Sequence, residues 1–98
     1  MTRLTFGLDF DDTFTACPTV WKRFIDHAEE LGHRIILVTS RRDTEENNEE
    51  IRGILRQWEV VLPIVFASLG SKLHAVAKRD IKVDIWIDDN PVALVNGH

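Results

Sequence analysis

Apolar runs of strand length alternate along this chain with segments of helical periodicity, and this alternation constrains the fold more than any other feature. The run Ile35-Ile36-Leu37-Val38 is apolar at every position, which is typical of a parallel strand that is covered on both faces. The patterns predict strands over residues 3–9, 35–39, 63–66 and 83–87, and helices over residues 18–31, 44–58 and 71–79. Alternating strands and helices indicate an α/β fold with a small parallel sheet of about four strands, flanked by helices.

Local signals predict the ends and faces of these elements. Pro63 at the start of the third strand indicates an edge strand, because proline cannot donate a hydrogen bond to a sheet. Asp43 and Glu46 have the spacing of a capping box at the start of the second helix. The third helix is expected to face inward at three apolar positions, Leu73, Val76 and Ala77.

Composition excludes several classes of protein. The chain has 98 residues, of which 44% are hydrophobic and 29% charged, so wholesale disorder is not expected. A single cysteine excludes a disulfide-stapled scaffold. The N-terminus does not resemble a signal peptide, and no apolar run reaches the roughly 18 residues of a membrane span. We therefore expect a cytoplasmic protein with no membrane partner. The net charge of −4 argues against non-specific nucleic-acid binding through a broad basic face.

Acidic and hydroxyl side chains fall at the ends of the predicted strands. Asp9 ends the first strand, Thr39 the second and Asp88 the last. The carboxyl ends of parallel strands share one edge of the sheet, where catalytic residues gather in open α/β folds. Four carboxylates are expected to meet at this edge: Asp9, Asp11, Asp88 and Asp89. They would repel one another unless a cation lay among them, and ligands that are all oxygen favour Mg²⁺.

Four segments, in order, resemble the motifs of the haloacid dehalogenase (HAD) superfamily of phosphohydrolases. Leu8-Asp9-Phe10-Asp11-Asp12-Thr13 is similar to the DxDxT signature, and Ile35-Ile36-Leu37-Val38-Thr39-Ser40 looks like the second motif. Lys72 resembles the lysine of the third motif, and Ile85-Trp86-Ile87-Asp88-Asp89 resembles the acidic fourth motif. The resemblance implies a single Rossmann-like core domain over residues 1–98, acting as a Mg²⁺-dependent phosphomonoesterase.

The resemblance also implies the catalytic roles. In the family, the first aspartate of DxDxT attacks phosphorus to form an aspartyl-phosphate, and the second protonates the leaving oxygen. Asp9 and Asp11 occupy these positions here. A hydroxyl from Thr39 or Ser40, with the choice open, would contact the transferring phosphoryl group.

The remaining roles concern charge. Lys72 would supply a positive charge, and its position favours it over Lys78, which lies about 9 Å further along the helix axis. The metal would be held by the four clustered carboxylates, Asp9, Asp11, Asp88 and Asp89, and the choice between the last two as direct ligands stays open. Arg41 and Arg42 follow the second motif directly, so they serve either substrate-phosphate binding or solubility.

The chain departs from the family pattern in having no space for a cap domain. Residues 13–39 and 40–72 each hold one predicted helix and one predicted strand. An uncapped site favours a macromolecular phosphorylated substrate, such as a nucleic-acid end or a phosphoprotein, or a homo-oligomer whose partner subunit covers the site. The two arginines favour nucleotides or nucleic-acid ends.

Two other functions compete with the hydrolase interpretation. A receiver-type phosphoacceptor domain would place its acceptor aspartate at the end of the third strand and a lysine after the last strand. Here Phe66-Ala67 ends the third strand, and no lysine follows Asp89. A catalytically silent HAD-fold interaction module is the other alternative, and the intact motifs argue against it.

Overall fold

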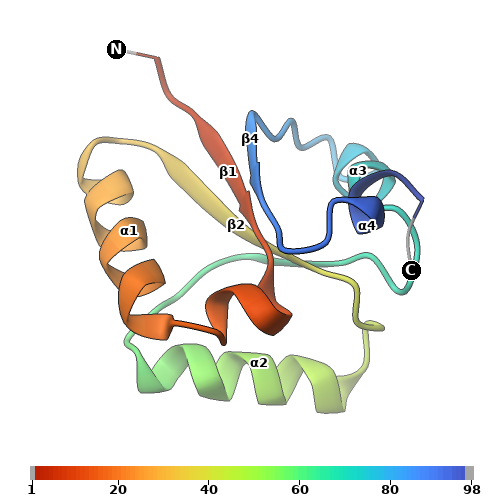
Figure 1. Ribbon diagram of the computed structural model, residues 1–98, viewed down its shortest axis with the longest axis horizontal. Coiled ribbons are helices and arrows are strands. Elements are labelled where there is room, and N and C mark those ends of the chain that lie inside the picture. The colour runs from red at the N-terminus through yellow and green to blue at the C-terminus, as the bar shows by residue number, and fades with distance from the viewer. Residues whose placement is uncertain (1, 97–98) are drawn as a thin grey trace.

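The computed structural model describes residues 2–96 and has alternating strands and helices around one sheet, with two helical elements after the first strand (Figure 1). In chain order the elements are β1 (Thr5–Leu8), a kinked helical turn η1 (Phe10–Phe14), α1 (Pro18–Glu30), β2 (Arg34–Thr39), α2 (Glu45–Gln57), β3 (Ile64–Phe66), α3 (Lys72–Ala77), β4 (Ile85–Ile87) and α4 (Val92–Val95). Most predicted elements are found within two residues of their expected ends. The α/β fold class is confirmed.

The four strands form one parallel sheet in the order β3-β2-β1-β4. Leu8 is paired with Leu37 on one side and with Ile87 on the other, so these three strands reach the same edge of the sheet together. The expected edge position of β3 is confirmed, and Pro63 immediately precedes it. The register therefore brings the residues that follow β1 and β4 close together.

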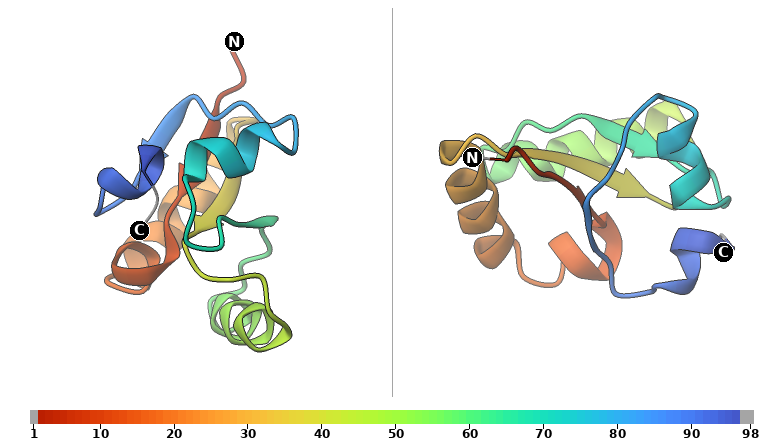
Figure 2. Two further views of the ribbon diagram at one scale, coloured as in Figure 1. Left: turned by 90° about the vertical axis from the view of Figure 1, so that its right-hand side faces the viewer. Right: turned by 90° about the horizontal axis from the view of Figure 1, so that it is seen from above.

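Helices cover both faces of the sheet, and β2 shows the division residue by residue. Ile35 and Leu37 pack into a buried cluster with side chains of η1, α1 and α2. Ile36 and Val38 pack on the opposite face with Val76 of α3. Two views at right angles show α1 and α2 separated from α3 by the sheet (Figure 2). This two-sided burial explains why β2 is apolar at consecutive positions.

Gly7 allows β4 to pack closely against β1. A Cβ atom at this position would lie 2.9 Å from two ring carbons of Trp86, which is paired with Gly7 across the strands. The absence of a side chain thus makes room for the indole at the centre of the sheet.

The predicted inward face of α3 is wrong at two of its three positions. Val76 is buried, as expected, but Leu73 is 42% exposed and Ala77 is also exposed. Lys72 instead shares the inward face with Val76, because positions four apart lie one above the other on a helix. Apolarity alone did not identify this face.

The predicted capping box of α2 is also wrong. The Thr44 side chain caps the helix by accepting a hydrogen bond from the Asn47 backbone N–H at 3.1 Å. The Asp43 backbone N–H donates to the Ser68 hydroxyl at 3.3 Å, which places Asp43 in the preceding loop. The helix consequently begins one residue later than the capping box requires.

The connections between core elements are short. Within residues 2–96, α1 alone lies between η1 and β2, and α2 and β3 alone lie between β2 and α3, so neither interval carries an inserted cap domain. None of the helices in this part of the chain has the length and apolar character needed to cross a bilayer.

Candidate active site

The site lies at the point where the strand order of the sheet reverses. From β1 the chain continues to β2 and β3 on one side, and then returns to place β4 on the other side of β1. Asp9 follows β1, Asp88 follows β4, and the Asp9 backbone N–H donates to the Ile87 carbonyl at 2.9 Å. Ligands of open α/β sheets bind at such reversal points, outside the carboxyl ends of the strands. The expected position of the site at this edge is therefore supported by the topology.

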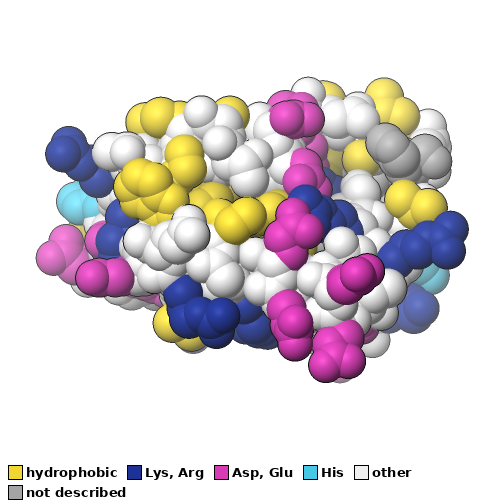
Figure 3. Space-filling view, turned by 90° about the horizontal axis from the view of Figure 1, so that it is seen from below, with side chains coloured by type: hydrophobic (Ala, Val, Ile, Leu, Met, Phe, Trp, Pro, Cys, Tyr) yellow, Lys and Arg dark blue, Asp and Glu magenta, His cyan; other side chains and the backbone are white. Residues whose placement is uncertain are grey.

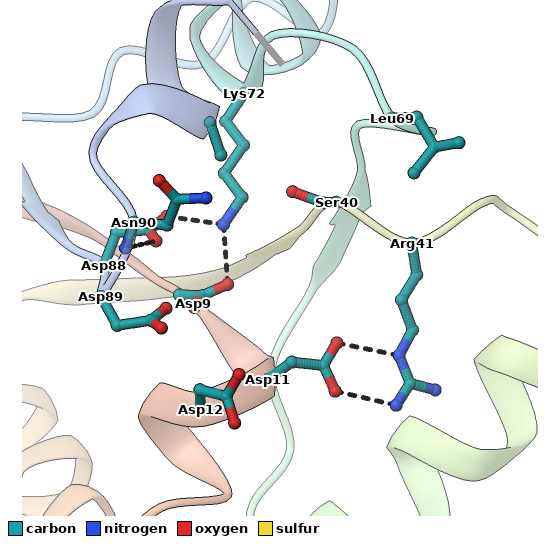
Figure 4. A pocket seen from close by; sticks show the side chains of 11 residues that line it. Asp9, Asp11, Asp12, Ser40, Arg41, Leu69, Lys72, Asp88, Asp89 and Asn90 are labelled. Carbon is teal, nitrogen blue, oxygen red and sulfur yellow. Dashed lines mark hydrogen bonds and ion pairs between the residues drawn. The ribbon is translucent and has the colours of Figure 1, made fainter. Parts of the chain in front are cut away.

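Lys72 joins the two carboxylates at this point. Its ammonium donates to Asp9 Oδ1 at 2.7 Å and to Asp88 Oδ2 at 2.5 Å (Figure 4). The lysine side chain is only 1% exposed, so its charge is compensated inside the protein by both aspartates. It begins α3, where the Ser71 hydroxyl caps the helix and donates to the Leu94 carbonyl of α4 at 2.7 Å. The start of α3 is thus anchored where the lysine can reach the site.

Asp9 is a buried acid of the site. Burial raises its pKa from 3.8 to about 6, although the hydrogen bond from Lys72 acts in the opposite direction. The Thr13 hydroxyl donates to Asp9 Oδ2 at 3.0 Å and lies 3.4 Å from Asp89 Oδ1. Asp9 is therefore held through both of its oxygens.

Three carboxylates form a candidate cation site. Asp9, Asp88 and Asp89 each offer an oxygen, and these oxygens lie within 4.8 Å of one another. One ammonium cannot neutralise three carboxylates, and an all-oxygen donor set suits a hard divalent cation such as Mg²⁺. Figure 3 shows a band of acidic side chains across one face of the molecule, with basic side chains within it and beside it. The residues present thus fit a divalent cation.

Asp11, the fourth expected member, does not belong to this carboxylate cluster. Its oxygens accept two hydrogen bonds from the guanidinium of Arg41, from Nε at 3.0 Å and from Nη2 at 2.9 Å. Figure 4 shows the Asp11 carboxylate directed toward Arg41 rather than toward Asp9 and Asp89. The expected convergence of four carboxylates is corrected to three, because the planar fork of an arginine matches a carboxylate and holds it.

Arg41 is itself held by several neighbours. Its guanidinium donates to Glu50 Oε1 at 3.2 Å and to Asn47 Oδ1 at 3.3 Å, and it lies 5.4 Å from the centre of the Phe10 ring. The hydrogen bond to Asp11 raises the pKa of Arg41 above its ordinary value, so the side chain stays charged. Arg42, by contrast, is exposed and does not line the pocket. Of the two arginines considered for phosphate binding from the sequence, Arg41 lines the pocket and Arg42 does not.

The structure also separates the two candidate hydroxyls. Ser40 lines the pocket, and Figure 4 shows its hydroxyl directed toward the side where Lys72 and Asp9 lie. Thr39 is fully buried, and its hydroxyl accepts a hydrogen bond from the Arg41 backbone N–H at 3.2 Å. Ser40 is therefore placed to contact a ligand, whereas Thr39 supports the loop that carries Arg41.

The pocket that these residues form has a volume of about 290 Å³ and includes residues to which no role was assigned from the sequence. The additional lining residues are Asp12, Leu69, Asn90 and Ala93. Ala93 belongs to α4, a helix that is not among the three predicted from the sequence. Thr13 was recognised as part of DxDxT but was given no role. The contact between Thr13 and Asp9 forms across a turn whose backbone is not helical at Asp11 and Asp12, so helical spacing gave no signal for it.

Comparison of the chain with protein-family models, with curated proteins and with solved structures finds no match.

Proposed function

We propose that this protein is a Mg²⁺-dependent phosphomonoesterase that works through an aspartyl-phosphate on Asp9, in the manner of the HAD superfamily. The observation that carries the proposal is the arrangement around Asp9. A buried carboxylate at the reversal point of the sheet is held by Lys72 and Thr13, next to two further acids. Such a concentration of charge at a sheet edge is costly unless it serves a ligand.

The proposed reaction has two steps. An oxygen of Asp9 attacks phosphorus, the bond to the leaving oxygen breaks, and Asp11 donates a proton to that oxygen so that an alcohol departs. A water molecule then attacks the phosphorus of the aspartyl-phosphate, Asp11 takes up the proton of the water, and inorganic phosphate and free Asp9 are formed. Asp11 lies on the turn directly after Asp9, which suits a group that must reach the same phosphate.

The other pocket residues stabilise negative charge in this scheme. The Lys72 ammonium and the Ser40 hydroxyl line the pocket beside Asp9 and would contact the phosphoryl oxygens. A divalent cation held by the three clustered carboxylates, Asp9, Asp88 and Asp89, would neutralise charge on the phosphoryl group.

The absence of a cap in the described part of the chain bears on the substrate. An open pocket has no wall of its own against water, so we propose a macromolecular phosphorylated substrate or a homo-oligomer whose partner subunit covers the site. We place the activity in the cytoplasm, in line with the single cysteine.

The direct test is phosphate release from an aryl phosphate in the presence of Mg²⁺. The wild type should turn over, Asp9→Asn should not, and Asp26→Asn should behave as the wild type because Asp26 lies on α1 and is paired with Lys22. A fluoroberyllate adduct in a crystal should be attached to Asp9. Wild-type activity in Asp9→Asn would refute the nucleophile. No turnover of any phosphorylated metabolite, nucleic-acid end or phosphopeptide would favour the silent interaction module.

A further inference from the structure

We infer that Arg41 is a positioning residue that holds Asp11 away from the reacting phosphate until a second anionic group of the substrate replaces it. The inference rests on the proposed function and names the substrate class, which is phosphomonoesters that carry a second phosphate or a comparable anion. The proposed role of Asp11 as an acid conflicts with its position in the structure. The residue proposed to protonate the leaving oxygen is fully engaged with an arginine on the opposite wall of the pocket.

The contacts of Asp11 show that it is the movable partner. Its side chain is 48% exposed, and within residues 2–96 both hydrogen bonds that its carboxylate accepts come from Arg41. To reach a leaving oxygen beside Asp9, the carboxylate must turn away and give up both charge-assisted bonds. Among the described residues, no other side chain forms a hydrogen bond with the Asp11 carboxylate.

The contacts of Arg41 show that it stays in place when Asp11 leaves. Glu50 and Asn47, both on α2, accept hydrogen bonds from the same guanidinium, and the ring of Phe10 lies against it. Its backbone N–H is fixed separately by the Thr39 hydroxyl. A departure of Asp11 therefore leaves a fixed cation at the pocket wall with two donors, Nε and Nη2, facing the vacated space.

The charges of the pocket indicate what would take that space. Five carboxylates line the pocket (Asp9, Asp11, Asp12, Asp88 and Asp89), with Lys72 and Arg41 as its two basic side chains. Lys72 already lies between Asp9 and Asp88, so Arg41 is the cation that can change partners. A phosphate or phosphonate offers the same two-oxygen geometry as a carboxylate and would replace Asp11 one for one. The exchange would bind the second anion and free the proposed acid in the same event.

The test compares alkyl phosphates with the same compounds carrying a terminal phosphonate, which cannot be hydrolysed, over linkers of increasing length. For the wild type, the phosphonate at the best linker length should raise kcat by about 3- to 10-fold, the range expected for exchanging one well-formed ion pair. In Arg41→Ala this preference should vanish, so that the ratio of the kcat values for the two substrates falls to about one. Arg41→Lys, which keeps the charge without the fork, should retain only part of the preference.

The control is Arg23→Ala, since Arg23 is an exposed arginine of α1 and should leave the preference unchanged. An equal fall in kcat for both substrates in folded Arg41→Ala would mean that Arg41 serves the reacting phosphate or the fold, and would overturn the inference. So would a wild type that hydrolyses both substrates with equal kcat at every linker length.

A binding measurement decides the inference independently of turnover. Calorimetry in Mg²⁺ would compare an alkyl monophosphonate with an alkyl bisphosphonate on the wild type and on Asp11→Asn. Asp11→Asn frees Arg41, so the variant should gain affinity for the bisphosphonate by about 3- to 10-fold more than for the monophosphonate. Equal gains for both ligands would refute the exchange. If the wild type released phosphate from no substrate, the proposed function would be refuted but the inferred exchange would not, because the calorimetric binding measurement needs no turnover.

Discussion

The ammonium of Lys72 lies 2.7 Å from the Asp9 carboxylate, although 63 positions separate the two residues in the chain. The contact forms because the chain, after the edge strand β3, returns through α3 toward the end of β1. Both side chains are almost inaccessible to solvent, with exposed fractions of 1% for Lys72 and 8% for Asp9. A buried ammonium between two carboxylates couples the stability of the fold to the charge of the site.

Lys72→Met should therefore destabilise the metal-free protein by about 3–5 kcal/mol, because it leaves Asp9 and Asp88 buried without their common cation. Mg²⁺ should restore part of that loss, so the rise in Tm on adding Mg²⁺ should be larger in this variant than in the wild type. Lys78→Met, an exposed lysine at the end of the same helix, is the control and should change Tm little. Equal effects of the two substitutions would contradict the buried ion pairs.

Mg²⁺ should raise the Tm of the wild type, by an amount equivalent to about 2.7 kcal/mol when its concentration is a hundred times the Kd. Asp89→Asn should reduce this shift, because Asp89 is one of the three clustered carboxylates. Asp11→Asn should leave most of the shift intact, since its carboxylate is bound to Arg41. Thermal unfolding over a series of Mg²⁺ concentrations measures both. If Asp11→Asn removed the shift in Tm as Asp89→Asn is expected to do, the Asp11 carboxylate would also belong to the cation site.

The pH dependence of stability should reflect Asp9. Its pKa is raised from 3.8 to about 6, so between these values the folded state binds a proton more tightly than the unfolded state. The contribution of Asp9 to the free energy of unfolding is therefore fully present below about pH 4. It is lost as pH rises through about 6, and the free energy of unfolding falls by at most about 3 kcal/mol. Urea unfolding without divalent ions should show this decline in the wild type and a flatter profile in Asp9→Asn. Parallel profiles would refute the raised pKa.

Ser40 and Thr39 should respond differently to removal of their hydroxyls. Ser40→Ala should lower kcat by about 10- to 100-fold with Tm unchanged, because its hydroxyl faces the pocket and its loss removes one donor to the phosphoryl group. Thr39→Val should cost about 1–3 kcal/mol of stability, because the backbone N–H of Arg41 loses its acceptor. Steady-state kinetics and thermal unfolding of both variants separate the two roles. The reverse assignment of effects would make Thr39 the ligand contact.

The parallel sheet and the edge that carries the site could be predicted because their signals are local. The apolar run 35–38 marks a doubly covered strand, and Asp9 and Asp88 lie directly after their strands in the chain. Once the strands are parallel, such residues must meet at one edge. Lys72 could be placed there as well, because the start of a helix that follows a strand lies at that same edge.

The sequence by itself thus determined which residues reach the edge of the sheet that carries the candidate site, whereas only the tertiary structure decided how they pair there. The orientation of Asp11 depends on Arg41, which lies 30 positions away and is held by α2. The inward face of α3 depends on where Ser71 begins the helix and on how α3 packs against β2. Periodicity records which positions share a face, but the partner of a charged side chain is chosen by distance and geometry in the folded chain.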